Sequence, residues 1–260
     1  RLGAGLVTLS FPESLNDILE VKLTEVMTEP LPETEAQTIG REALDRLLHL
    51  AADKSAVAIG PGLGTHPSTQ KLVHELLAAL RIPIVLDADG INALAGQADL
   101  LRGVAGPLIL TPHPGEMSRL LGVPRDEVLG RRIALAQDVA NRFNVTVVLK
   151  MARTVIALPT GDAAIVPTGN PGMATGGTGD VLTGLIAGLL AQGIAPGLAA
   201  QAGAYIHGMA GDLAAERLGQ EAMLAGDLLE RVPEAIQHLK AGKSVRLFEG
   251  SGVRLFTGPE

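Results

Sequence analysis

Short apolar runs recur along the first two thirds of the chain, each bounded by glycine, proline or aspartate. Continuous apolar runs of this length are typical of strands that are buried on both faces of a parallel sheet. The runs occupy residues 6–9, 56–59, 82–86, 107–110, 145–149, 155–158 and 163–166. We therefore expect a mostly parallel central sheet.

Helical periodicity, with apolar residues three and four positions apart, separates several of these runs. It predicts helices over 68–80 and 124–142, followed by helices alone over 179–190, 197–218 and 225–239. Strands that alternate with helices and then give way to a helical end predict one three-layer α/β domain. We place this domain at residues 1–240.

Residues 241–260 follow the last predicted helix and contain a short repeat, SVRLFEG at 244–250 and GVRLFTG at 252–258. This tail has no evident place in the predicted core. We interpret it as an edge hairpin, an oligomer contact, or a disordered or appended piece, since chain ends are where such pieces concentrate.

Composition narrows the classes of partner. The 260 residues carry a net charge of −7, 2% aromatic residues and no Trp, which argues against a nucleic-acid backbone, an anionic membrane or a base-stacking platform. The sequence contains no cysteine, so disulfides, zinc–thiolate sites and cysteine nucleophiles are excluded. Apolar stretches stay short of the roughly 20 residues that span a bilayer, and the first residues do not resemble a signal peptide. We expect a cytoplasmic protein that acts on a small molecule.

The densest chemical signal is the segment PTGNPGMATGGTGD at 167–180, which leads directly into an apolar helix. Glycine lets backbone N–H groups approach a ligand closely, and a helix start adds unpaired N–H donors and a positive dipole end. The segment therefore predicts a phosphate cradle, in which Asp180 could accept a proton from a hydroxyl beside the transferred phosphoryl group. The alternative is a flexible turn with Asp180 as an ordinary N-cap. The spacing fits neither a P-loop nor a GxGxxG turn.

Two carboxylates, Asp87 and Asp89, follow the predicted strand at 82–86. Strand ends are usual places for ligand contacts in open α/β sheets, and residues two apart point the same way if the strand persists. Because Mg²⁺ prefers a few carboxylates and several waters, either residue is a candidate ligand. The alternative is that one of them caps the helix that follows.

The longer string NPGMATGGTGDVLTGLIAGLLAQG at 170–193 closely resembles the ADP/ATP-dependent NAD(P)H-hydrate dehydratases, and its GTGD resembles the anion-hole signature of ribokinase-like kinases. Three further segments agree in order: IGPGLG at 59–64, LDADGIN at 86–92 and LTPHPGE at 110–116. The resemblance covers about residues 1–238. It implies a ribokinase-like three-layer α/β/α fold with a mostly parallel central sheet.

The resemblance also implies roles for single residues. The family's GPGLG loop and TPHPGE segment contact the hydrated nicotinamide nucleotide, which implies the hydrate-binding residues Gly62, Gly64, His113 and Asp180. The family's Lys-Gly-Ala-x-Thr segment and Gly-rich turn line the adenine nucleotide, which implies the nucleotide-binding residues Lys150, Ala152, Arg153, Thr154, Gly176, Gly177, Thr178 and Gly179. From the residues alone, a structural turn at 60–64, a structural His113 and a solvated Lys150 stay open. Glu116 is either a first-turn helix carboxylate or a metal ligand.

The chain departs from the family's pattern at two places. Met151 stands where glycine is usual; if that glycine needs a positive φ, methionine adds strain of order 1 kcal/mol and weakens nucleotide binding. The family also opens with a strand, a Gly-rich loop and a helix ahead of the segment that begins here at residue 1. A central strand and a substrate-binding alanine region are thus missing from this sequence. Either the sequence is truncated relative to the natural protein, which we favour, or the fold tolerates a gap. An epimerase is expected to be either fused or separate.

The resemblance implies a two-step reaction. Adenine nucleotide phosphorylates the 6-hydroxyl of (S)-NADHX or (S)-NADPHX, the hydrates of NADH and NADPH, with Asp180 as base and Mg²⁺ bridging the phosphates. Loss of phosphate then restores NADH or NADPH. The donor is ADP in bacterial relatives and ATP in eukaryotic ones, and relatives suggest a homo-oligomer such as a tetramer. Two alternatives remain: a ribokinase-like kinase that leaves a phosphorylated small alcohol or vitamin precursor, and a nucleotide-binding module without activity.

Overall fold

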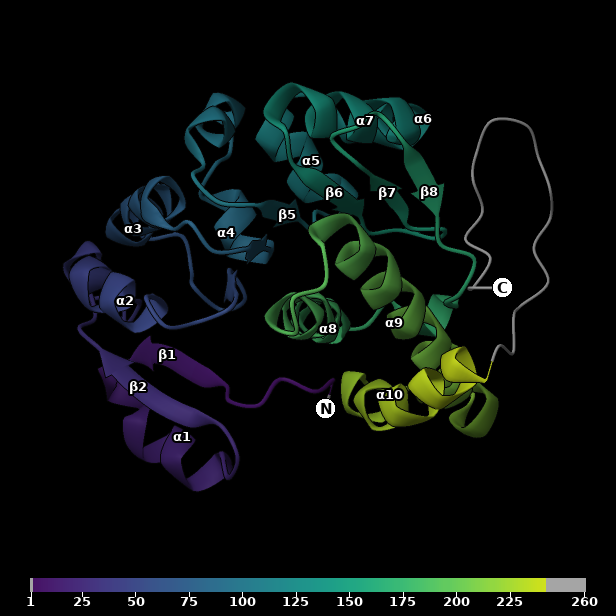
Figure 1. The fold of residues 1–260 in the computed structure, drawn as a ribbon, viewed down its shortest axis with the longest axis horizontal. Helices are drawn as coiled ribbons and strands as arrows, with labels where there is room; N and C mark the ends of the chain where they lie inside the picture. The colour runs from purple at the N-terminus through teal and green to yellow at the C-terminus, as the bar shows by residue number, and fades with distance from the viewer. Residues whose placement is uncertain (1, 242–260) are drawn as a thin grey trace.

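Six short strands form the central sheet of the computed structural model, which describes residues 2–241 (Figure 1). The strands lie in chain order: β3 (Val57–Ile59), β4 (Ile84–Leu86), β5 (Leu108–Leu110), β6 (Thr146–Leu149), β7 (Val155–Ala157) and β8 (Ala163–Ile165). Strands β3 to β6 pair in parallel, and β7 pairs antiparallel with both β6 and β8, so that β7 alone runs opposite to the other five strands. The prediction of a mostly parallel sheet is confirmed.

Strands β7 and β8 pair antiparallel because the connection between them is short. Only residues 158–162 connect β7 to β8, and a parallel connection requires a crossover of a dozen or more residues. The apolar runs at 155–158 and 163–166 therefore predict strands correctly, although a run of this kind does not reveal the direction of its strand.

Helices cover both faces of the sheet, because successive strand residues point to opposite sides. In β4, Ile84 and Leu86 pack into one core and Val85 into the other, and all three are fully buried. Helices α3 (Pro67–Ala79), α5 (Pro114–Leu121) and α7 (Arg132–Phe143) cover the first face. Helices α8 (Thr178–Ala191) and α9 (Pro196–Leu218) cover the second, and α10 (Ala225–Lys240) packs on α9 (Figure 1). The expected three layers are present.

The remaining helices are short. They are α2 (Leu44–Ala51), α4 (Ala88–Asn92) and α6 (Arg125–Gly130), with 3₁₀ turns at Glu13–Leu15, Arg41–Ala43, Ala98–Gly103 and Pro171–Met173. The single helix predicted over 124–142 is wrong in one respect. Arg131 has φ −121° and ψ 26°, so α6 ends at Gly130, a poor helix former, and α7 starts afresh.

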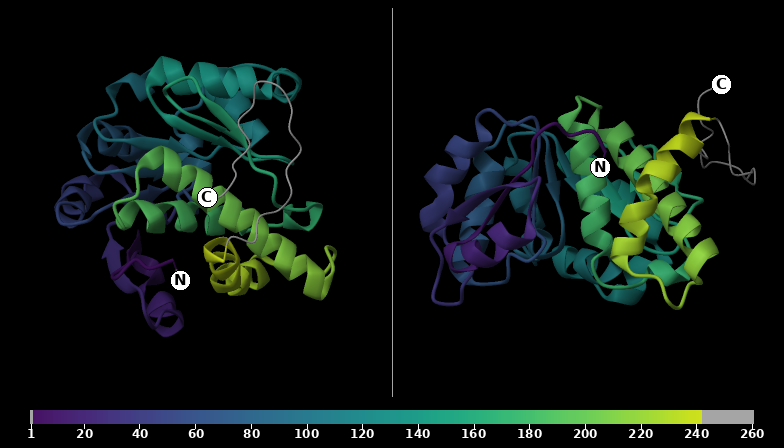
Figure 2. Two further views of the ribbon diagram at one scale, coloured as in Figure 1. Left: turned by 45° about the vertical axis from the view of Figure 1, so that its right-hand side comes forward. Right: turned by 90° about the horizontal axis from the view of Figure 1, so that it is seen from below.

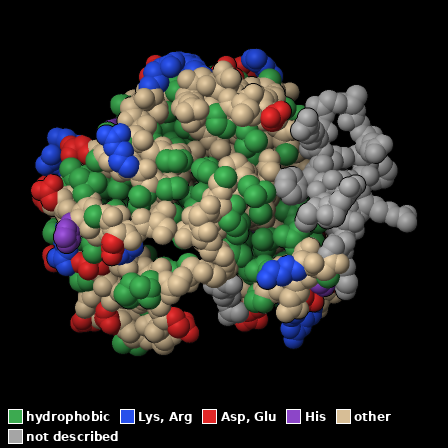
Figure 3. All heavy atoms as spheres, in the orientation of Figure 1, with side chains coloured by type: hydrophobic (Ala, Val, Ile, Leu, Met, Phe, Trp, Pro, Cys, Tyr) green, Lys and Arg blue, Asp and Glu red, His purple; other side chains and the backbone are tan. Residues whose placement is uncertain are grey.

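The N-terminal unit, residues 2–31, lies apart from this sheet (Figure 2). It holds β1 (Thr8–Pro12), α1 (Asn16–Lys22) and β2 (Met27–Leu31), and β1 pairs with β2 in parallel. The strand expected at 6–9 is present but shifted toward the C-terminus. The pattern missed β2, because its Glu29 and Pro30 do not resemble a buried strand. In the space-filling view a hollow lies along part of the boundary between this unit and the rest of the molecule (Figure 3). Elsewhere the two are in contact, since Leu31 packs into the first core and Gln192 Nε2 donates to the Leu2 carbonyl oxygen at 2.7 Å.

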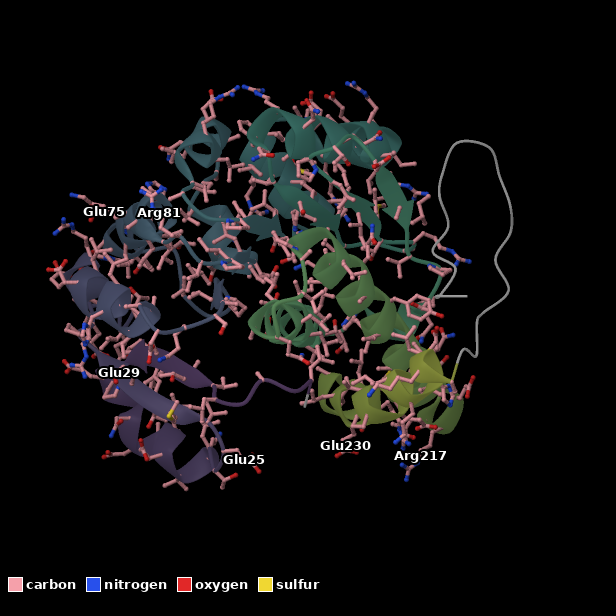
Figure 4. The ribbon with its side chains drawn as sticks, viewed as in Figure 1. Glu25, Glu29, Glu75, Arg81, Arg217 and Glu230 are labelled. Atoms are coloured by element: carbon pink, nitrogen blue, oxygen red, sulfur yellow. The ribbon has the colours of Figure 1, made fainter. Side chains whose placement is uncertain are left out.

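The rim of the molecule is polar. Glu75 on α3 and Arg81 just beyond it extend outward from the first layer, and Arg217 and Glu230 extend from the opposite layer (Figure 4). Within residues 2–241, no helix is long and apolar enough to cross a membrane. Apart from Ala241, the predicted tail lies outside the described residues.

Candidate active site

A cluster of charged side chains lies at the carboxyl ends of β4 and β6, against α8. Lys150, the residue after β6, places its Nζ 2.5 Å from Asp87 Oδ1 and 3.8 Å from Glu116 Oε2. The second oxygen of Asp87 accepts a hydrogen bond from Thr183 Oγ1 at 2.7 Å. Asp87 is 1% exposed. We call Asp87, Glu116, Lys150 and Thr183 the charge cluster.

Asp87 and Asp89 do not point the same way. The strand ends at Leu86 and α4 begins at Ala88, so the alternation of a strand does not persist. Ala88 has φ +46°, a left-handed conformation that an alanine rarely adopts. Asp87 occupies the N-cap position of α4 but makes no capping bond with its side chain, which turns to the charge cluster. Strained backbone of this kind is found preferentially at functional sites.

The GPGLG loop after β3 folds directly over Asp87. A Cβ on Gly60 would lie 1.7 Å from the Asp87 carbonyl oxygen, so only glycine fits there. The backbone N–H of Gly64 donates to Asp89 Oδ2 at 2.9 Å, and Gly62 and Gly64 each have φ +73°. Asp89 therefore orders the loop to which the hydrate-binding role is assigned, while Asp87 belongs to the charge cluster.

His113 forms the N-cap of α5, so Glu116 lies in the first turn of a helix, one of the two alternatives that the sequence left open. The Nδ1 of His113 accepts hydrogen bonds from Gly115 N at 2.9 Å and Glu116 N at 3.3 Å, so Nδ1 carries no proton. The backbone N–H of His113 in turn donates to Glu116 Oε2 in the first turn at 2.7 Å, which completes a capping box. Burial lowers the pKa of His113, and Lys150 acts in the same direction while Glu116 opposes it. Half of the His113 side chain stays exposed, so the ring is both a cap and available to a ligand.

Asp180 lies in the first turn of α8 and is not its N-cap. The N-cap is Gly177 at φ +87°, a conformation that suits glycine. Among the residues described, Asp180 makes no hydrogen bond or ion pair, and its side chain is exposed. Desolvation, followed by the negative charge of Asp87, raises the pKa of Asp180, and Lys150 opposes this. A carboxylate without a protein partner beside a Gly-rich helix start can accept a proton from a bound ligand.

Two side chains that the sequence did not single out hold the Gly-rich segment. His207 of α9 places Nε2 2.8 Å from the Thr178 carbonyl oxygen, and burial lowers the pKa of His207 to about 4, so the neutral ring donates this bond. Asp212 of α9 accepts from Gly169 N at 2.9 Å and from Asn170 Nδ2 at 3.0 Å. Both lie far along the chain, on a helix without a motif, so no sequence signal pointed to them.

The turn after β6 connects the charge cluster to the Gly-rich segment. Arg153 Nη1 donates to the Pro167 carbonyl oxygen at 2.6 Å, and Thr154 Oγ1 donates to the Met151 carbonyl oxygen at 3.3 Å. Ala152 and Arg153 are exposed. The residue with a positive φ is Arg153, at +63°, and not Met151. The condition for strain at Met151 is therefore not met, and the strain falls two residues further on.

Four residues of the Gly-rich segment, 176–179, to which the resemblance gives a nucleotide-binding role, lie at the start of α8. Gly176 and Gly177 are exposed, and Thr178 Oγ1 donates to the carbonyl oxygens of Met173 at 2.8 Å and Thr175 at 2.9 Å. A Cβ on Gly179 would lie 3.4 Å from Lys150 Nζ. The structure thus brings together the turn at 150–154 and the turn at 176–179.

The carboxylates proposed for Mg²⁺ do not form a metal centre. Asp87 is engaged by Lys150 and Thr183, Asp89 by the Gly64 amide, and Glu116 by the His113 amide. The described chain contains no group of three or more His, Cys, Asp or Glu side chains that could hold a metal ion. Mg²⁺ in nucleotide sites is usually bound through one or two carboxylates together with phosphate oxygens and several waters, so it does not require such a group.

The fold defines a class of protein. A mostly parallel sheet with helices on both faces is a ribokinase-like α/β fold. The structure of a ribokinase-like superfamily protein from Enterococcus faecalis matches with a TM-score of 0.74 at 29% identity, covering 90% of this chain and 78% of that one. Residues 1–234 match the sequence profile of the NAD(P)H-hydrate dehydratases. The chain belongs to this family.

The chain is also similar to individual proteins that are named for the repair or dehydration of NAD(P)H-hydrate. The bifunctional NAD(P)H-hydrate repair enzyme of Moorella thermoacetica is 52% identical over 240 residues, which are 92% of this chain and 45% of the relative. The ADP-dependent (S)-NAD(P)H-hydrate dehydratase of Bacillus subtilis is 42% identical over 178 residues, 68% of this chain and 62% of the relative. A crystal structure of the B. subtilis ADP/ATP-dependent dehydratase, co-crystallized with ATP/Mg2+ and soaked with CoA, matches with a TM-score of 0.75 at 34% identity, covering 91% of this chain and 82% of that one. The chain spans about half the length of the bifunctional relatives.

Proposed function

We propose that this chain dehydrates (S)-NADHX or (S)-NADPHX to NADH or NADPH at the expense of an adenine nucleotide. The observation that carries the proposal is Asp180, an exposed carboxylate whose side chain makes no hydrogen bond or ion pair within residues 2–241. It lies in the first turn of α8, directly after the backbone amides of 176–179. A helix start of this kind binds phosphate through its N–H groups and dipole. The names of the family and of its relatives support the same reaction.

In the first step the 6-hydroxyl oxygen of the hydrate bonds to the terminal phosphorus of the nucleotide, and the bridging P–O bond breaks. Asp180 accepts the hydroxyl proton, while the amides of 176–179 neutralise charge on the phosphoryl oxygens. The raised pKa of Asp180 makes it a better proton acceptor than an ordinary aspartate. In the second step the C6–O bond breaks with its electron pair on phosphate, and a proton leaves ring carbon 5 to water.

Two parts of the site bind the two substrates. The 60–64 loop and His113 hold the hydrate, and the turn at 150–154 with 176–179 holds the nucleotide. We infer ADP as donor with AMP and phosphate as products, in line with the name of the B. subtilis relative. Mg²⁺ enters with the nucleotide phosphates.

The decisive experiment incubates the full-length protein with hydrated NADH, ADP and Mg²⁺. Recovery of the near-ultraviolet absorbance of NADH, with AMP and phosphate released in equal amounts, supports dehydration. Accumulation of a phosphorylated alcohol without NADH would instead select the kinase alternative, and tight AMP binding without turnover would select a binding module. Parallel runs with ATP and with hydrated NADPH determine the preferred donor and hydrate.

We further infer that residues 1–240 are the dehydratase part of a cytoplasmic protein and work beside an epimerase activity, as the bifunctional relatives suggest. We propose a homo-oligomer with a tetramer as the first candidate. A mass measurement in solution on the full-length protein tests the oligomeric state, and an assay with the R epimer of the hydrate tests for epimerase activity on the same chain.

A further inference from the structure

Lys150 has hydrogen-bonding capacity that the protein does not use. Its side chain is only 19% exposed, and Asp87 Oδ1 at 2.5 Å is its one hydrogen-bond acceptor within residues 2–241. Glu116 Oε2, at 3.8 Å, is too far for a hydrogen bond but contributes negative charge. An ammonium group has three N–H donors. Two donors of a mostly buried cation are therefore left for a ligand, and an anionic ligand fits them best.

The position of this ammonium is specific. A Cβ on Gly179 would lie 3.4 Å from Lys150 Nζ and 3.9 Å from Asp87 Oδ2, so glycine leaves the ammonium in direct contact with the first turn of α8. Asp180 is the next residue in that turn. The family's pattern places the Lys150 segment along the adenine nucleotide, whereas the geometry places the Lys150 charge where the helix start would bind the phosphoryl group.

Asp87 is held from two sides. Thr183 Oγ1 donates to its Oδ2, and Thr183 lies three residues after Asp180 on the same face of α8. The left-handed backbone at Ala88 and the close approach of Gly60 to the Asp87 carbonyl fix the main chain. The carboxylate therefore ties β4, β6 and α8 together and determines where the Lys150 ammonium lies.

We propose that Lys150 is the cation that contacts the transferred phosphoryl group, and that Asp87, held by Thr183, is the positioning residue that keeps the ammonium at the start of α8. This inference rests on the proposed function. As the hydroxyl oxygen bonds to phosphorus and the bridging P–O bond breaks, the Lys150 ammonium donates hydrogen bonds to the phosphoryl oxygens. The hydroxyl proton goes to Asp180. A fixed cation at developing charge lowers the barrier without reorganisation at the moment of reaction.

A double-mutant cycle on turnover tests the coupling. Lys150→Met is expected to lower kcat about 10²- to 10³-fold, and Asp87→Asn about 10- to 100-fold, because the ammonium is then misplaced. In the Lys150→Met background, Asp87→Asn should cost less than about 3-fold, since residues that act as a unit are non-additive. The KM for the hydrate should stay within about 3-fold in all variants, because the 60–64 loop and His113 are unchanged. Thr183→Val should lower kcat and Thr183→Ser should retain it.

Binding gives a second readout that does not depend on turnover. By calorimetry, Lys150→Met should weaken ADP about 10-fold or more and leave AMP nearly unchanged, because AMP lacks the phosphoryl group that the ammonium contacts. If the wild-type protein does not dehydrate the hydrate but shows this ADP-specific loss, the proposed function fails and the Lys150 assignment stands. Equal loss of ADP and AMP would overturn the assignment and return Lys150 to the adenine side.

Folding is controlled separately. Lys150→Met leaves Asp87 as an unpaired buried charge, so this variant is expected to melt earlier, and the double variant with Asp87→Asn should recover part of the loss. Asp99→Asn is the matched control, an exposed carboxylate paired with Arg102 and Arg142 away from the site, and its kcat should be that of the wild type. An equal kcat loss for Asp87→Asn in both backgrounds would refute a role through Lys150.

Discussion

The central sheet and the N-terminal unit are built from the same kind of short parallel strand, yet only the sheet buries its strands. Every residue of β4 and β5 is at most 3% exposed. In β1 only Phe11 is buried, and Leu6 and Val21 nearby are 80% and 83% exposed. All members of the charge cluster and Asp180 come from the sheet, α5 or α8. Because these parallel strands are closely packed on both faces, their carboxyl ends are held in place. The functional side chains that follow them are therefore held in place as well.

The largest expected effect tests whether this rigid edge performs the chemistry. Asp180→Asn keeps the size of the side chain but cannot accept a proton at neutral pH. Turnover should fall about 10²- to 10⁴-fold, the usual contribution of a general base. AMP affinity and melting temperature should barely change, because Asp180 is exposed and makes no bond to the described protein. Steady-state kinetics is the measurement, and a variant that keeps more than about a tenth of the wild-type rate contradicts the assignment.

The next effect concerns the backbone that supports the site. A Cβ at Gly60, where φ is +139°, meets the Asp87 carbonyl oxygen at 1.7 Å, so Gly60→Ala should lower the free energy of unfolding by about 3–5 kcal/mol and abolish turnover. Gly96→Ala is the control: it also has a positive φ, +68°, but no atom lies within 4 Å of its Cβ, and about 1 kcal/mol is expected. Denaturant unfolding measures both. Equal losses would show that the close approach to Asp87 is not what requires glycine.

His207 gives the sheet region its own pH dependence. Burial lowers its pKa from 6.5 to about 4 in the folded chain, so the unfolded chain binds the proton first as the pH falls. Its contribution to stability is therefore intact above pH 6.5 and is lost progressively down to pH 4, by about 3 kcal/mol at most. His207→Gln keeps an N–H donor for the Thr178 carbonyl and should flatten the unfolding free energy over this pH range. An unchanged slope in urea titrations at several pH values would assign it to other groups.

The sequence predicted those parts of the molecule in which a local structure requires particular residue types in a short stretch. Apolar runs predicted all six strands of the sheet, because buried strands need apolar residues on both faces. The same rule missed β2, which contains Glu29 and Pro30 and is only partly buried. The GTGD and TPHPGE segments predicted the location of the site, because glycine and proline are the residues that unusual backbone conformations require.

What the sequence could not give was contact between distant residues. Asp87 and Thr183 are 96 positions apart, and His207 and Asp212 lie on α9 within the largely apolar sequence AYIHGMAGDLAA at 204–215, which contains no recognisable motif. The strain that a positive φ would cause at Met151 does not arise, because the turn places its positive φ at Arg153. Composition does not determine which residue of a short turn takes that conformation. A sequence pattern can indicate which residue types form a site. Which of these side chains contact one another is determined only when the sheet and its helices are packed.

The smallest expected effect compares the two regions through one substitution. Val21 on α1 is 83% exposed and Val85 on β4 is fully buried. Val85→Ala removes two buried methyl groups and should lower the free energy of unfolding by about 2 kcal/mol, whereas Val21→Ala should change it by less than about 0.5 kcal/mol. Both are measured by denaturant unfolding of the same chain at several protein concentrations. If Val21→Ala costs as much as Val85→Ala, the apolar side chains of the N-terminal unit are covered in solution. A loss that grows with protein concentration would show that a second copy covers them, while a loss independent of concentration would show that the same chain does.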